Sequence, residues 1–65
     1  MAEKKSLALA IEKARHLSLL HPDTTYYVMD MYKKHAFVTD KEWIYKECIL
    51  EYWMCECKFR NGVKI

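Results

Sequence analysis

The first apolar pattern along the chain is helical. Five apolar residues recur at spacings of three and four, which places them on one stripe of a helix: Leu7, Ala10, Ile11, Ala14 and Leu17. Pro22 pushes the residue before it out of the α region, so the pattern predicts a helix over residues 5–20, with Ser6 as N-cap if the helix starts late. Leu9, His16 and Leu20 fall on the side away from the stripe.

The pattern then changes to that of a β-hairpin over residues 25–39. Two runs rich in aromatic and β-branched residues, 25–32 and 36–39, flank the polar pair Lys33-Lys34, which is the predicted turn. The pair lacks the Asn-Gly or Asp-Gly of tight hairpins, which leaves a longer loop open. With this turn Met29 lies opposite Val38 and Met31 opposite Ala36, and this apolar face is predicted to meet the helix.

A second helix and a final strand follow. Thr39-Asp40-Lys41-Glu42 has the form of a capping box, which predicts a helix starting at Asp40. The inner stripe of this helix is predicted to consist of Tyr45, Cys48, Ile49 and Tyr52. Trp43 and Leu50 lie on the opposite side. From Trp53 to Arg60 residues alternate with period two, which predicts a strand that points the thiols of Cys55 and Cys57 to the same side. Asn61-Gly62 favours a tight turn, after which residues 63–65 are predicted to fold back as a short fourth strand.

These elements predict an α+β fold of two layers in the order α-β-β-α-β(-β). A helix joins the second strand to the third, so these two strands should be parallel. The right-handed crossover places the first strand between them. The predicted architecture is a small antiparallel sheet in the order 2-1-3 with two helices on one face.

Length and composition restrict the class of protein. Sixty-five residues form a single small domain, residues 1–65, with a thin margin of stability. A hydrophobic share of 52%, with one Gly and one Pro, excludes a disordered or collagen-like chain. No uncharged stretch approaches the roughly 20 residues that span a bilayer, and the apolar stripe of the first helix is interpreted as a core face rather than a membrane face.

Charge and cysteine usage add two expectations. The net charge is +2, with basic ends and an acidic middle: residues 40–56 hold five carboxylates and two lysines. No secretory leader is recognisable, so we expect a reducing cytoplasm. The three cysteines are therefore expected to be reduced, metal-free and mostly buried. The alternative is a zinc site in which Cys48, Cys55 and Cys57 combine with histidines: His16, His21 and His35.

Catalytic signatures are lacking in the sequence. The only glycine is Gly62, so there is no Gly-rich phosphate loop, and no local motif pairs a cysteine with a histidine. The carboxylates of residues 40–56 are explained as solvated surface. We therefore expect no enzymatic activity and no cofactor.

One function that the sequence leaves open is binding of single-stranded nucleic acid. Tyr26, Tyr32, Phe37 and Tyr52 would stack bases on an open sheet, and four basic residues would contact phosphates: Lys33, Lys34, Lys58 and Arg60. The acidic Asp30 and Glu56 would project on the same face.

The favoured hypothesis is a protein-interaction surface, because the apolar residues exceed what one small core can hold. Both hairpin faces are apolar and both helices carry a second apolar group. Such surplus surface marks a partner site, and a two-fold homodimer is the simplest partner. The predicted interface consists of Tyr26, Val28, Tyr32, Phe37, Leu9 and Leu20.

The order of a helix, a Thr-Tyr-Tyr-Val hairpin and a closing Phe-Arg-Asn-Gly-Val resembles short prokaryotic or phage accessory proteins. This resemblance implies no particular function. The sequence therefore predicts a small cytoplasmic interaction or regulatory protein, with a homodimer as its expected form.

Overall fold

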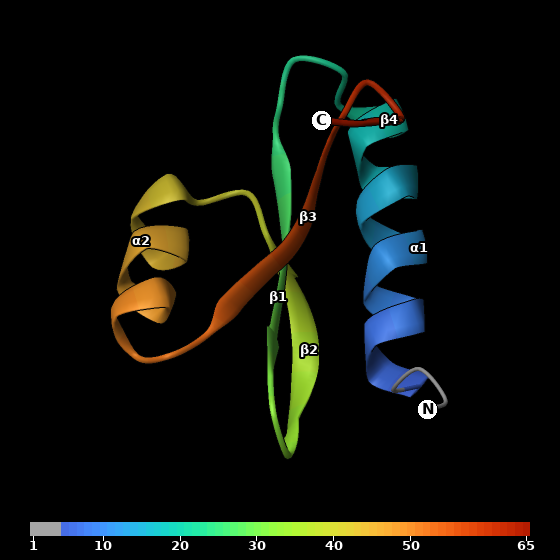
Figure 1. The fold of residues 1–65 in the computed structure, drawn as a ribbon. Coiled ribbons are helices and arrows are strands. Elements are labelled where there is room, and N and C mark those ends of the chain that lie inside the picture. Colours follow the sequence, from blue (N-terminus) through green and yellow to red (C-terminus); the bar gives the residue numbers. More distant parts are fainter. Residues whose placement is uncertain (1–4) are drawn as a thin grey trace.

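The structure, a computed structural model, describes residues 5–65. It has the predicted α+β class and element order (Figure 1). Its elements are α1 (Lys5–Leu20), β1 (Tyr26–Met31), β2 (Lys34–Thr39), α2 (Glu42–Leu50), β3 (Met54–Arg60) and β4 (Val63–Lys64). The sheet has the order β2-β1-β3-β4 and each neighbouring pair is antiparallel, so the predicted 2-1-3 order is confirmed and the short fourth strand lies outside β3.

The two helices lie on opposite faces of the sheet, and the expectation that they share one face is wrong (Figure 1). Helix α1 packs on Val28 and Phe59, whereas α2 places Tyr45 against Tyr27, the neighbour of Val28 in β1. Consecutive residues of a strand point to opposite faces. The crossover rule constrains only the helix between β2 and β3. Helix α1 precedes the sheet, so the rule leaves it free to cover the other apolar face.

The hairpin register differs by one residue from the prediction. The turn is Tyr32-Lys33, with Lys33 in the left-handed region at φ 66°, and Met31 pairs with Lys34. Val28 therefore lies opposite Val38, and Phe37 opposite Met29, with a bulge towards the turn. A shift of one residue moves a strand's side chains to the other face. Ala36 and Val38 therefore share the face of Val28, and this face, not that of Met29, meets α1.

A second bulge changes the orientation of the cysteines in β3. Cys57 lies opposite Val28 and Cys55 opposite Met29, although one residue separates the two cysteines. Val28 and Met29 point to opposite faces, so their partners do as well. The expectation that both thiols share one side is wrong, because Glu56 is the extra residue that the bulge inserts.

Helix α2 begins two residues later than expected, and the capping box is not formed. Lys41 is the N-cap and has no side-chain cap. The Thr39 hydroxyl instead accepts a hydrogen bond from the Lys41 N–H at 3.1 Å, a local turn that competes with the cap. At the other end Tyr52 adopts φ 69°, and the Trp53 N–H donates to the Cys48 carbonyl at 2.8 Å. This is a Schellman ending made without glycine.

A stripe of small residues lets α1 approach the sheet closely. Ala10, Ala14 and Ser18, spaced by four, are buried, and Leu7 is buried one turn before them. The predicted stripe of this helix is confirmed, with Ile11 and Leu17 packed at its margins. Ser6 is not the N-cap: it lies inside the first turn, and its hydroxyl accepts a hydrogen bond from the N–H of Ala36 in β2.

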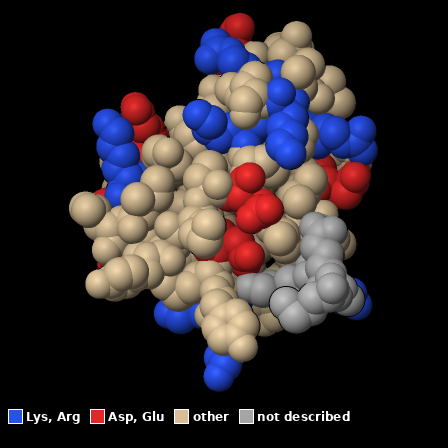
Figure 2. Space-filling view, in the orientation of Figure 1, with Lys and Arg blue, Asp and Glu red and all other residues tan. Residues whose placement is uncertain are grey.

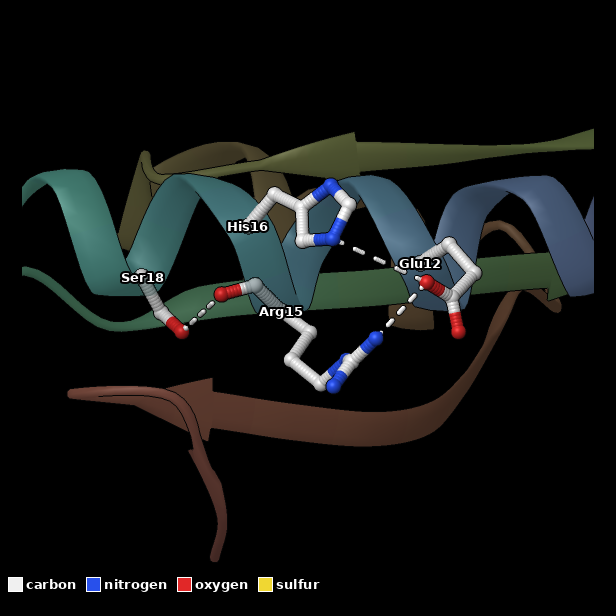
Figure 3. A network of polar contacts seen from close by, with 4 residues as sticks. All are labelled: Glu12, Arg15, His16 and Ser18. Atoms are coloured by element: carbon white, nitrogen blue, oxygen red, sulfur yellow. Dashed lines mark hydrogen bonds and ion pairs between the residues drawn. The ribbon is translucent and has the colours of Figure 1, made fainter.

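Ser18 joins α1 to the turn between β3 and β4. Its hydroxyl donates to the Arg15 carbonyl at 2.8 Å and accepts from the Gly62 N–H at 2.9 Å. Figure 3 shows the first of these bonds beside the exposed ion pair of Arg15 with Glu12. Gly62 has φ 76°, and a Cβ there would lie 2.4 Å from a methyl carbon of Leu19. The Asn61-Gly62 turn predicted from sequence is confirmed, and the positive φ of Gly62 favours glycine at this position.

Candidate interaction surface

The residues expected to form the interface are dispersed over the fold. Tyr26 and Val28 belong to the core under α1, and Val28 is fully buried. They are therefore unavailable to a partner of the folded protein. Phe37 is half-buried on the opposite face, with its ring centroid 5.0 Å from that of Trp53 in an edge-on contact.

The other three expected residues are exposed but far apart in the fold. Leu20 ends α1 beside β4, whereas Tyr32 stands in the β1–β2 turn at the opposite end of the molecule (Figure 1). Leu9 lies on α1 beside strand β2. The structure does not bring the six residues together, because Val28 faces α1 while Phe37 lies on the opposite face of the sheet.

The largest group of exposed apolar side chains lies on the α2 side instead. Helix α2 has no buried residue. Four large side chains at this helix and the start of β3 are 64–89% exposed, and we name them the α2 surface: Trp43, Leu50, Tyr52 and Met54. In Figure 2 this side of the molecule, at the left of the view, presents a broad uncharged area. The sequence already placed Trp43 and Leu50 away from the inner stripe, which was the signal for this surface.

Local structure explains why these side chains point outward. Trp43 and Leu50 are seven residues apart, so they share one face of the helix. The inner face is occupied by Tyr45, which stacks on Tyr27 with ring centroids 4.4 Å apart. The Schellman ending then places Tyr52 at φ 69°, where its side chain is 89% exposed. One aromatic layer thus attaches α2 to the sheet, and a second apolar layer remains at the surface.

The charges near the α2 surface are mostly acidic. Glu47 of α2 and Glu51 at its C-cap are exposed, while Glu42 pairs with Lys46 at 3.5 Å. Burial raises the pKa of the Cys48 thiol, and the fields of Glu51 and Glu47 add to the rise. Burial, followed by the field of Glu42, also raises the pKa of Tyr27. Both groups therefore stay neutral at physiological pH.

The residues of the nucleic-acid hypothesis are not brought together. Lys33 and Lys34 lie at the β1–β2 turn, whereas Lys58 pairs with Tyr27 at the other end of β1, with Arg60 beyond it. The open aromatic sheet that base stacking needs is covered by α1 on one face and α2 on the other (Figure 1). Tyr26 is buried, and of the four proposed stacking residues only Tyr32 and Tyr52 are exposed.

The three thiols are dispersed and unbridged. Cys57 is buried on the α1 side, and Cys48 and Cys55 are half-buried, so the expectation that the cysteines are mostly buried holds for Cys57 alone. Burial is the main cause that raises the pKa of each thiol. Within residues 5–65 no three cysteine, histidine or acidic side chains gather as metal ligands. The sulfur and imidazole groups of the zinc hypothesis therefore do not form one site.

Comparison with known proteins finds no match for this chain. No protein-family model, curated protein or solved structure matches the chain. Neither helix of the described chain combines the length and the apolar character needed to span a bilayer.

Proposed function

We propose that the protein is a small, non-enzymatic interaction protein that acts as a homodimer through its α2 surface. The observation that carries the proposal is the exposure of four large apolar side chains on α2, a helix that buries no residue of its own, and on the segment that follows it: Trp43, Leu50, Tyr52 and Met54. Together they expose on the order of 500 Å² of apolar side chain, the size of patch that is often functional in small proteins. A reducing cytoplasm suits a chain whose three thiols are unbridged.

A second copy is the partner that best explains this surface. A two-fold interface would place each Leu50 and Trp43 against their counterparts, and it would cover both patches at once. A small domain gains stability from such burial, because its own core is limited. Glu47 and Glu51 would lie at the rim, where dissolved ions screen their repulsion, so dimerisation should strengthen as salt is added.

The experiment is light scattering coupled to gel filtration over a range of concentrations. The chain is 7.9 kDa, and we expect the wild type to approach twice this mass at high concentration. Leu50→Glu should yield a folded monomer. Leu20→Glu is the matched control, since Leu20 is comparably exposed at the end of α1, and this variant should dimerise as the wild type does.

Two results would contradict the proposal. One is a wild type that remains a monomer of 7.9 kDa at millimolar concentration, with the salt-induced increase also absent. The other is a dimer that Leu20→Glu dissociates and Leu50→Glu does not, which would place the interface at the end of α1.

A further inference from the structure

A groove runs along the open edge of the sheet, on the side away from the α2 surface. It lies between α1 and the edge strand β2 and has a volume of about 300 Å³. Its walls are Leu9, Ala10 and Lys13 of α1 and Ala36, Phe37 and Val38 of β2. The walls are mainly apolar, so the groove is suited to side chains such as Val or Ile.

The backbone of Val38 faces this open edge. In β3 the Lys58 carbonyl accepts a hydrogen bond from the N–H of Ile65, so Lys58 faces β4 and its neighbour Cys57 faces β1. Val28 lies opposite Cys57 and therefore directs its N–H and C=O towards β3. Val38 lies opposite Val28 on the other side, and its N–H and C=O consequently point away from the sheet.

The charges at this edge are of one sign. A second hollow, also about 300 Å³, adjoins the groove at the hairpin turn and is lined by Lys5, Ser6, Lys33, Lys34 and His35. Among residues 5–65, none that lines either hollow is acidic. Asp40, beyond the far end of β2, is paired with Lys41 at 4.0 Å.

We propose that this edge binds an extended acidic peptide segment of a partner protein, which adds to the sheet as a strand antiparallel to β2. The peptide backbone exchanges hydrogen bonds with the N–H and C=O of Val38, and an apolar side chain enters the groove beside Leu9 and Ala10. Strand β2 runs away from the turn, so an antiparallel peptide ends at the turn. Its acidic residues therefore belong at its C-terminal end, beside Lys5 and Lys33.

The same charges disfavour a second copy at this edge. Lysines on an edge strand discourage pairing between identical strands, because like charges are brought near each other. An acidic peptide turns this repulsion into attraction. The site is also separate from the α2 surface, so it remains open in the proposed dimer.

The test uses a fluorescent peptide in which Val and Thr alternate before a C-terminal run of Glu, titrated with the full chain and followed by anisotropy. We expect saturable binding that weakens as salt is added. Lys13→Glu and Lys33→Glu should each weaken binding about tenfold, and Leu9→Lys should block the groove. Lys64→Glu is the matched control with the same charge change, since Lys64 lies in β4 at the opposite edge, and it should bind within about twofold of wild type.

A backbone variant separates strand addition from mere charge attraction. The chain is short enough for chemical synthesis, and N-methylation of Val38 removes the edge N–H while keeping the side chain. We expect a tenfold or greater loss of peptide binding with an unchanged circular dichroism spectrum. If the spectrum shows that this variant unfolds, strand addition is tested in the wild type by NMR. The amide chemical shifts that change on adding peptide should centre on Ala36–Val38 and Leu9.

Three outcomes would overturn the proposal. They are equal binding of a peptide with Lys in place of Glu, equal loss of binding in Lys64→Glu and Lys33→Glu, and displacement of the peptide by a single-stranded oligonucleotide of comparable length. The last would assign the edge to nucleic acid. Dimerisation through the α2 surface is measured without peptide, so either proposal can fail while the other stands.

Discussion

The two faces of the sheet are covered by helices that differ in how they stabilise the fold. On the α1 side the core contains Ala14 and Val28 with no exposed surface, and the polar Ser18 has partners for its hydroxyl. On the α2 side the helix is attached by aromatic contacts, and none of its residues is buried. The difference shows that α1 contributes buried residues to the core on its face of the sheet. Helix α2 covers the other face only partly and exposes apolar side chains to solvent.

Glutamate substitutions on the two sides should give the largest contrast. Val28→Glu places a charge in a site with no exposed surface, so we expect it to cost more than 3 kcal/mol and to leave the chain largely unfolded. The same substitution at Leu50, which is 83% exposed, should change the free energy of unfolding of the monomer by only about 0.5 kcal/mol. Urea denaturation at low protein concentration measures both. Similar losses for the two variants would mean that α2 is as tightly packed as α1.

Removing the hydroxyl of Ser18 should have an intermediate effect. Ser18→Ala leaves the Gly62 N–H without its acceptor in a part-buried position, so a loss of about 1–3 kcal/mol is expected. The turn between β3 and β4 should loosen first, seen as faster hydrogen exchange of the Gly62 amide. A matched control is Ser6→Ala, which removes the hydroxyl that accepts from Ala36 at the exposed edge and should cost less. Equal losses would contradict the assignment of Ser18 as the link between α1 and the turn.

The cysteines provide the smallest and most local contrast. Cys57, buried under α1, should react with iodoacetamide more slowly at neutral pH than Cys48 and Cys55 on the α2 side. Mass spectrometry of the labelled protein identifies the order. Fastest labelling at Cys57 would show that the α1 side opens more readily than the α2 side.

The same thiols predict how stability depends on pH. Burial raises the pKa of Cys57 in the folded chain above its ordinary value of 9.0, so the folded state favours the neutral thiol. Its contribution to stability is complete below pH 9.0 and is lost as the pH rises through the folded pKa. The free energy of unfolding should therefore fall above about pH 9, and Cys57→Ala should reduce this fall. A stability that does not change between pH 8 and pH 10 would contradict the expectation.

Most of the fold could be predicted from the chain because its signals are local. The Leu7 to Leu17 stripe, Pro22 and the Asn61-Gly62 turn each act over a few residues, and the elements they specify are present. The predicted hairpin register differs by one residue from the observed register. The observed turn requires Lys33 to adopt a left-handed backbone conformation, which lysine does not favour, so the sequence did not indicate it. Tyr26 and Val28 were assigned to the wrong environment, because the opposite face of β1, that of Met29, was expected to meet α1.

Periodicity, turn residues and the handedness of the crossover are properties of the chain, so the elements, their order, the strand order and the surplus of apolar residues follow from the sequence alone. Which apolar face meets which helix depends on how the elements pack in three dimensions. Both faces of the hairpin are apolar, so local preferences do not distinguish them. The close approach that Ala10, Ala14 and Ser18 allow, together with the bulge at Glu56, puts Val28 and Cys57 under α1. That choice leaves Trp43, Leu50, Tyr52 and Met54 at the surface.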